Sequence, residues 1–105
     1  MEGGIITNED LQEYAPVWAP AVSVKLDSLG VTVHSVPPPG SGAIMEYILN
    51  ILGNYHMKPE DTSPLLYHRV TEAFKWAYAL RTEIGDPLGD DEIHDYVNQV
   101  CDHVW

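Results

Sequence analysis

The chain has 105 residues, with 16 Asp and Glu against five Lys and Arg, so its formal charge is −11 when the histidines are neutral. Contacts to phosphate groups are made mainly by Lys and Arg, so this balance argues against binding to a nucleic-acid backbone and disfavours anionic membranes. At 45% hydrophobic and 20% charged residues, the composition is that of a folded protein. The length allows one domain of roughly 100 to 150 residues.

Cysteine usage and the first residues exclude further classes. The lone Cys101 excludes an internal disulfide framework and a cysteine-based zinc cluster. Residues 1–7 contain no basic residue and no apolar run of signal-peptide length, and no stretch approaches the roughly 20 apolar residues of a membrane span. The sequence therefore predicts neither a leader nor an anchor and leaves the compartment open.

The first predicted element is a short helix. Thr7 is followed three residues later by Asp10, which is close to a capping box and predicts a helix over residues 8–14. Pro16 ends it.

A β-hairpin follows. Apolar and polar residues alternate over residues 22–26 and again over 31–33, on either side of a turn at 27–30. Pro37 cannot donate to a ladder, so the second strand ends near Val36. Two strands alone are marginal in water, which indicates that the sheet is incomplete.

Two helices come next, after a Pro/Gly stretch at residues 37–42. Ser41 caps a helix over 43–52 that is apolar nearly all round and therefore needs burial on most faces, with residues 53–54 as its C-cap. Ser63 caps a second helix that runs from Pro64 to about Ile84. Its apolar stripe is Leu66, Val70, Phe74 (or Ala73), Ala77 and Ile84.

A last helix is predicted within residues 88–105, with Asp90 and Asp91 available as caps. Its stripe follows the i, i+3, i+4 pattern and consists of Ile93, Tyr96, Val97, Val100, Cys101 and Val104. The predicted order is thus short helix, hairpin and three helices, an α+β chain.

Histidines are the first candidates for chemistry. His68 and Glu72 share one helix face but lack further ligands at matching spacing, so a partly exposed histidine beside a carboxylate is favoured over a metal site. Cys101 lies on the apolar stripe while His94 and His103 lie off it, which favours a buried structural cysteine.

The sequence gives only weak support for a catalytic triad, an aromatic binding groove or a calcium loop. Ser41 and His34 could form a triad with one of many aspartates, but no nucleophile elbow places them. Four aromatic residues at helical spacing favour core over a binding groove: Tyr67, Phe74, Trp76 and Tyr78. Four acidic residues favour a capped helix start over a calcium loop: Asp86, Asp90, Asp91 and Glu92. The residues therefore predict no catalytic, cofactor-binding or metal-binding position.

Five strings occur in one order that resembles the γ-glutamyltranspeptidase (glutathione hydrolase) family, in the later part of its large subunit. They are Gly3-Gly4-Ile5-Ile6-Thr7 with Asp10-Leu11 and Tyr14, Val36-Pro37-Pro38-Pro39-Gly40-Ser41-Gly42, Leu49-Asn50-Ile51-Leu52, Glu72-Ala73-Phe74-Lys75-Trp76-Ala77-Tyr78-Ala79-Leu80-Arg81, and Gly85-Asp86-Pro87. The resemblance covers residues 3–87.

The resemblance implies an N-terminal-nucleophile hydrolase, a four-layer αββα sandwich whose precursor cuts itself into a large and a small subunit. A threonine that begins the small subunit attacks the γ-glutamyl amide of glutathione, and its own α-amine can serve as base. No metal or organic cofactor is implied, and the family is membrane-anchored or secreted. The implied role of Arg81 is that of a structural charge partner.

This sequence departs from the family pattern at the nucleophile. No threonine stands in a context like the family cleavage site, and the family arginine that holds the substrate carboxylate lies upstream of the matched block. We therefore divide the chain into a γ-glutamyltranspeptidase-like large-subunit segment, residues 1–87, and a divergent helix, residues 88–105.

The expected function is that of a large-subunit fragment with a scaffold role and no activity alone. The expected partner is a small subunit or another chain that completes the sandwich, and self-association is a further expectation. The scaffold is assigned to Val22, Val24, Val31, Val33, Ile48, Leu52, Val70 and Phe74. The alternative is a small acidic interaction module that docks through the stripe at residues 93–104.

Overall fold

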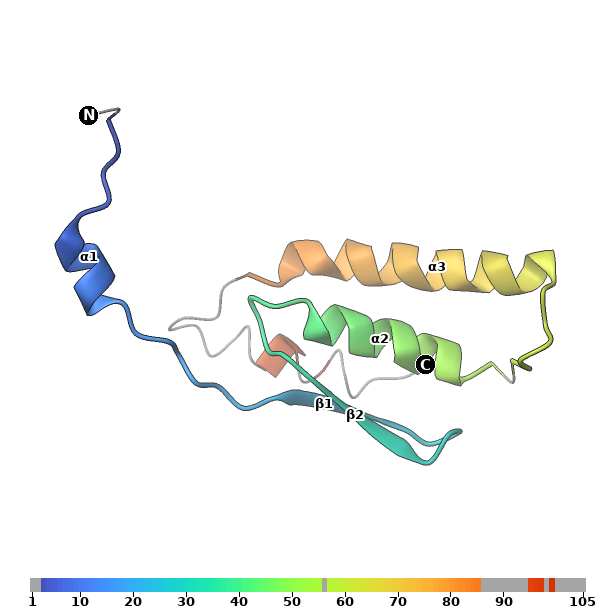
Figure 1. Ribbon diagram of the computed structural model, residues 1–105. Coiled ribbons are helices and arrows are strands. Elements are labelled where there is room, and N and C mark those ends of the chain that lie inside the picture. The colour runs from blue at the N-terminus through green and yellow to red at the C-terminus, as the bar shows by residue number, and fades with distance from the viewer. Residues whose placement is uncertain (1–2, 56, 86–94, 98, 100–105) are drawn as a thin grey trace.

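The computed structural model describes residues 3–55, 57–85, 95–97 and 99. Figure 1 shows its elements, which are α1 (Asn8–Glu13), β1 (Val22–Leu26), β2 (Val31–Ser35), α2 (Gly42–Gly53), α3 (Pro64–Leu80) and the 3-10 helix η1 (Arg81–Glu83). The predicted α+β class and the order of the elements over these ranges are confirmed. Within the predicted last helix, residues 95–97 and 99 are helical, and the rest of it lies outside the described residues.

The hairpin has one apolar and one polar face. β1 and β2 pair antiparallel, with Ser23 opposite His34. Val22, Val24 and Leu26 are buried, whereas Ser23 and His34 are exposed on the opposite face. A strand pair of this kind packs on a helix with one face and meets water with the other.

The turn between the strands follows the predicted break. The N–H groups of Leu29 and Gly30 both donate to the carbonyl oxygen of Leu26, at 3.0 and 2.9 Å. Gly30 has a φ of 65°, which a residue without Cβ adopts at little cost.

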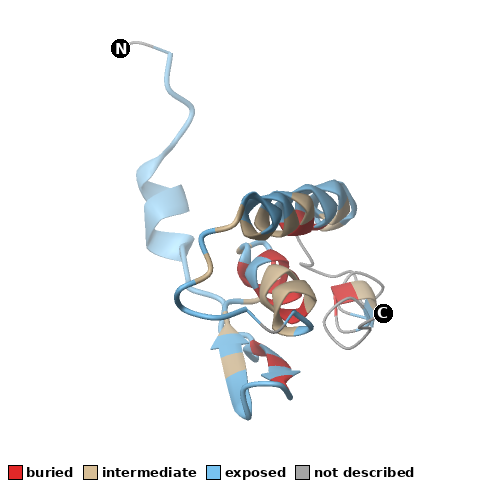
Figure 2. Cartoon of the chain, turned by 90° about the vertical axis from the view of Figure 1, so that its right-hand side faces the viewer, coloured by how far each residue is buried: buried red, intermediate tan, exposed pale blue. Residues whose placement is uncertain are grey.

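Helix α2 lies between the hairpin and α3 and contributes residues to both buried clusters of the core (Figure 2). The two buried clusters are Ile44, Tyr47 and Ala77, and Val22, Ala43 and Val97. Although the sequence reads as apolar nearly all round, α2 also buries two polar side chains, Glu46 and Asn50.

Helix α3 begins as predicted but ends earlier. The Ser63 hydroxyl accepts the N–H of Leu66 at 3.2 Å, and the helix stops at Leu80, where η1 takes over. Ala73 is 1% exposed and Phe74 is 47% exposed, so the buried stripe runs through Ala73. Two small residues, Ala73 and Ala77, allow α3 to approach α2 closely.

Of the eight residues assigned to the scaffold, two are exposed in this chain, and their role in a larger protein stays a prediction. Val22 and Val24 are buried, and four other residues are partly buried: Val33, Ile48, Leu52 and Val70. Val31 is 46% exposed because α2 packs mainly on β1 rather than on β2. Phe74 is exposed because Ala73 occupies the place that faces α2.

The N-terminal arm, defined as residues 3–21, stands away from the packed part (Figure 1). Every residue of the arm is exposed. The predicted capping box is confirmed, since the Asp10 N–H donates to Thr7 Oγ1 at 3.2 Å and the Thr7 N–H donates to Asp10 Oδ2 at 2.7 Å. The radius of gyration is 18.1 Å, whereas a compact domain of this length has about 13 Å.

None of the described helices combines the length and the apolar content that crossing a membrane requires.

Candidate functional site

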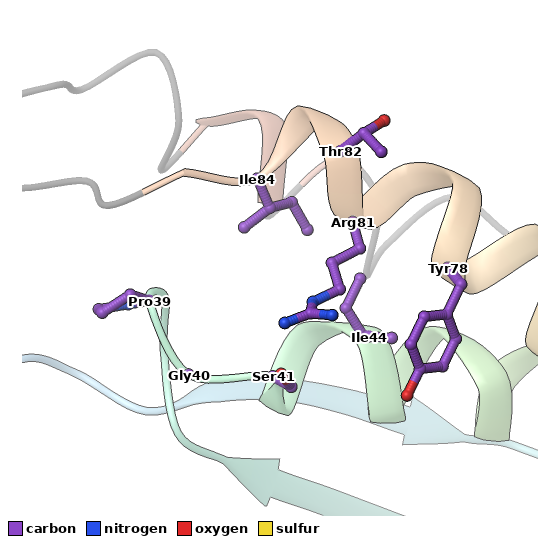
Figure 3. A pocket seen from close by; sticks show the side chains of 8 residues that line it. All are labelled: Pro39, Gly40, Ser41, Ile44, Tyr78, Arg81, Thr82 and Ile84. Atoms are coloured by element: carbon purple, nitrogen blue, oxygen red, sulfur yellow. The ribbon is translucent and has the colours of Figure 1, made fainter.

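A cavity of about 410 Å³ lies between the Pro/Gly loop and the C-terminal end of α3 (Figure 3). Pro39, Gly40 and Ser41 form its loop side. Ile44 from the first turn of α2 and Ile84 after η1 supply apolar walls. The cavity therefore joins segments that are about forty residues apart in the sequence.

The loop side is held by its own backbone and by close contact with the hairpin. The Gly40 N–H donates to the Pro37 carbonyl oxygen at 2.9 Å. A Cβ on Gly42 would press into the Val36 carbonyl oxygen and lie within 2.5 Å of Ser35 Oγ. Only glycine allows α2 to begin this close to the end of β2.

Arg81 and Tyr78 line the cavity from the α3 side. In Figure 3 the Arg81 side chain descends from the end of α3 toward the first turn of α2, while Thr82 points away from the space. The Arg81 Cζ lies 5.9 Å from the centroid of the Tyr78 ring, a long contact for a cation over an aromatic face.

The ion pairs of the described residues lie elsewhere. Lys25 Nζ contacts Asp27 Oδ1 at 2.7 Å and Lys75 Nζ contacts Glu72 Oε1 at 2.7 Å, and both pairs are solvent-exposed. The hydrogen bond from Lys75 lowers the pKa of Glu72. Within the described ranges, Arg81 makes none of these pairs, so the implied role of a structural charge partner has no counterpart there.

Within the described part of the chain, the residues considered for a catalytic triad or a metal site are not brought together. His34 lies on the polar face of the hairpin, while Ser41 lines the cavity at the start of α2. His68 and Glu72 lie on α3 without further ligands, and among the described residues no group of His, Cys, Asp or Glu is arranged to hold a metal ion.

The aromatic residues of α3 were expected to be core and are exposed. Tyr67 is 63%, Trp76 62% and Tyr78 59% exposed. They flank the buried face of the helix, which is set by Ala73 and Ala77, and Tyr78 also lines the cavity. The remaining candidates lie outside the described residues: Asp86, Asp90, Asp91, Glu92, His94, Cys101 and His103.

Over its full length, residues 1–105, the sequence matches the family described as gamma-glutamyltranspeptidase. The chain belongs to this family. The match includes residues 88–105, and the boundary that we place after residue 87 stays a prediction.

The curated relatives include glutathione hydrolases and a scoloptoxin. The chain is 46% identical over 88 residues to the glutathione hydrolase proenzyme of Escherichia coli, covering 81% of this chain and 15% of the relative. It is 41% identical over 101 residues to glutathione hydrolase 2 of Arabidopsis thaliana, covering 95% of this chain and 17% of the relative. It is also 45% identical over 89 residues to Scoloptoxin SSD14 of Scolopendra dehaani, covering 80% of this chain and 15% of the relative.

This chain of the γ-glutamyltranspeptidase family thus spans about one sixth of the length of these relatives. The sequence reading missed the cavity, although two of the five strings, residues 36–42 and 72–81, contain most of its lining. The sequence contains the lining residues within these two strings, but it does not show that the strings meet, because their contact depends on how α2 and α3 pack.

Proposed function

We propose that this γ-glutamyltranspeptidase-family chain forms a structural layer of the large subunit of a glutathione hydrolase, which cleaves and transfers the γ-glutamyl group, and that it has no activity alone. The observation that carries this proposal is the family match over residues 1–105, with glutathione hydrolases among the relatives. The chain's own threonines do not resemble the family's cleavage site.

The layer that we assign to the larger protein consists of the hairpin, α2 and α3. Its packing supports a scaffold role, because α2 is covered by the hairpin on one side and by α3 on the other. We propose the αββα sandwich as the fold of the complete protein, finished by a small subunit or another chain. The polar outer face of the hairpin favours a place at the margin of that sandwich, since a central strand pair is apolar on both faces.

The first experiment is an assay of the 105-residue chain with γ-glutamyl-p-nitroanilide. We expect no release of p-nitroaniline above a buffer control. Turnover that a point variant of this chain abolishes would overturn the proposal that the chain is inactive alone.

The second experiment tests the scaffold role by grafting the matched segment into the Escherichia coli proenzyme, to which it is 46% identical. We expect the chimaera to cleave itself into two subunits and to hydrolyse the anilide. A graft with Ile44→Ala, which opens the core, is expected to lose soluble, processed enzyme, whereas a graft with the exposed Tyr67→Ala keeps it. A well-folded but unprocessed chimaera would contradict the assignment.

The alternative interaction module stays a prediction. Two residues of its stripe, Tyr96 and Val97, pack on the core of this same chain, which leaves less of the stripe for a partner. Sedimentation that finds a compact, salt-insensitive monomer would argue against it.

A further inference from the structure

We propose that the cavity between the Pro/Gly loop and α3 binds a carboxylate group, with Arg81 as its counter-ion. The family resemblance implies that the arginine that holds the substrate lies upstream of the matched block, so the role proposed here for Arg81 is a separate one. Four residues carry the proposal: Arg81, Tyr78, Ser41 and Ile44.

The charge of the lining is the first argument. The chain has 16 acidic and five basic residues, yet the described lining contains one arginine and no carboxylate. The ion pair of Lys75 with Glu72 on α3 shows that a cation on this part of the chain contacts an acid where one lies within reach. The Arg81 guanidinium thus faces a cavity whose described lining contains no acid. Its planar fork of N–H donors matches the two oxygens of a carboxylate.

The start of α2 is the second argument, because the N-terminal end of this helix lies on the opposite side of the cavity through Ser41 and Ile44. Ser41 is the N-cap residue of α2, but its side chain makes no capping hydrogen bond, and the first turn contains no acidic residue. In contrast, Glu9 and Asp10 occupy the first turn of α1. An anion below Arg81 would therefore be attracted by the positive end of α2 as well.

The apolar walls restrict the ligand. Ile44 and Ile84 face the same space as Arg81, so a carboxylate on a short carbon stem fits better than a bare inorganic anion. Such a group belongs either to an acidic side chain of another polypeptide segment or to the free α-carboxylate of an amino acid or short peptide. Because Arg81 is exposed, we expect a dissociation constant on the order of 1 mM that rises with added salt.

The test is a titration of the full 105-residue chain, followed by NMR at the Arg81 Nε–H and the backbone N–H groups of residues 42–44, at constant ionic strength. Three matched probes are used. The α-amide of N-acetylglutamate offers a side-chain carboxylate, N-acetylglutamine offers an α-carboxylate, and the α-amide of N-acetylglutamine offers none. We expect saturable shifts with one or both of the first two and none with the third.

The stronger of the two acidic probes identifies the source of the ligand. Tighter binding of the side-chain carboxylate indicates a polypeptide segment, and tighter binding of the α-carboxylate indicates a small acid. Equal shifts from the neutral probe, or tighter binding of inorganic phosphate than of both carboxylates, would overturn the proposal.

Variants of Arg81 in η1 and of Lys75 in α3 separate binding at the site from the effect of the overall charge of the chain. Arg81→Gln is expected to weaken binding at least tenfold, and Arg81→Lys, which keeps the charge but not the fork, to weaken it several-fold. Lys75→Gln removes one positive charge from α3, outside the described lining of the cavity, and is expected to leave binding unchanged. Circular dichroism checks that the variants fold, and binding that survives Arg81→Gln in a folded chain would refute the role of Arg81.

Discussion

The N-terminal arm and the packed part obtain their helices in opposite ways. Helix α1 has a complete capping box and buries none of its residues. Helix α2 begins at Ser41 without a side-chain cap hydrogen bond and buries six residues. The comparison teaches that a cap defines where a helix starts, while burial of a face supplies most of its stability.

Apolar side chains are exposed in the arm, whereas side chains of the same kind are buried in the packed part. Ile6 is 77% and Trp18 is 93% exposed, whereas Ile44 is 5% exposed. A six-residue helix without tertiary contacts is marginal in water, because its nucleation cost is spread over few hydrogen bonds. We therefore expect the two regions to respond differently to the same chemical change.

The largest difference is expected for truncation of one isoleucine in each region. Ile44→Ala removes a side chain from the cluster with Tyr47 and Ala77 and should lower the free energy of unfolding by about 2 to 5 kcal/mol. Ile6→Ala in the arm should change it by less than about 0.5 kcal/mol. Urea unfolding followed by circular dichroism measures both, and similar losses would show that the arm is packed in solution.

A smaller difference is expected at two glycines of α2. Gly42→Ala should destabilise the chain by about 1 to 3 kcal/mol, because the new Cβ meets Val36 and Ser35. Gly53→Ala is the matched control, since its Cβ would lie 3.5 Å from Ser28 Oγ, an ordinary contact. It should be neutral or stabilising by up to about 1 kcal/mol through helix propensity. Equal effects in urea unfolding would contradict the close approach of α2 to the hairpin.

Most of the fold could be predicted from local signals. The alternation of Val22, Val24 and Leu26 and the caps at Thr7 and Ser63 are statements about neighbouring residues, and each is confirmed within one or two residues. The end of α3 was placed four residues late, because the chain tightens into η1 while Ile84 still packs on the core.

The packing partners could not be predicted in the same way. Ala73 and Phe74 are adjacent and both fit the helical period, so the choice between them depends on how closely α3 approaches α2. The cavity depends on the same crossing, since it brings Arg81 over Ser41. The burial of Glu46 also follows from tertiary position, since a glutamate in a helix gives no local sign of it.

The third prediction compares the two helix caps. Ser63→Ala removes the acceptor of the Leu66 N–H in the packed part and should lower the free energy of unfolding by about 1 kcal/mol. Thr7→Ala removes the equivalent acceptor in the arm and should leave global unfolding unchanged while the Cα shifts of residues 8–13 move toward coil values. Urea unfolding combined with NMR measures both readouts. A global loss in both variants would mean that α1 unfolds together with the core.

The smallest expected effect is a titration confined to the arm. Hydrogen bonds from the Thr7 backbone and side chain lower the pKa of Asp10 below its usual value of 3.8. The contribution of the Asp10 carboxylate to α1 is therefore present above pH 3.8 and is lost as the pH falls through the lowered pKa. Since Asp10 is exposed and the arm buries nothing, acidification should reduce the helicity of residues 8–13 without a matching change at Ala77.

The control is the same titration in Thr7→Ala, where the Asp10 pKa should return part of the way toward its usual range, because the bond from Thr7 Oγ1 is lost while the backbone N–H of residue 7 can still donate. Asp61 provides an internal comparison, since the Ser63 N–H lowers its pKa at the entrance to α3 in the packed part. NMR of the two carboxyl carbons follows both groups in one sample. An Asp10 pKa that Thr7→Ala leaves unchanged would show that the capping box does not persist when α1 lacks tertiary support, and the arm would then differ from the packed part in local order as well as in burial.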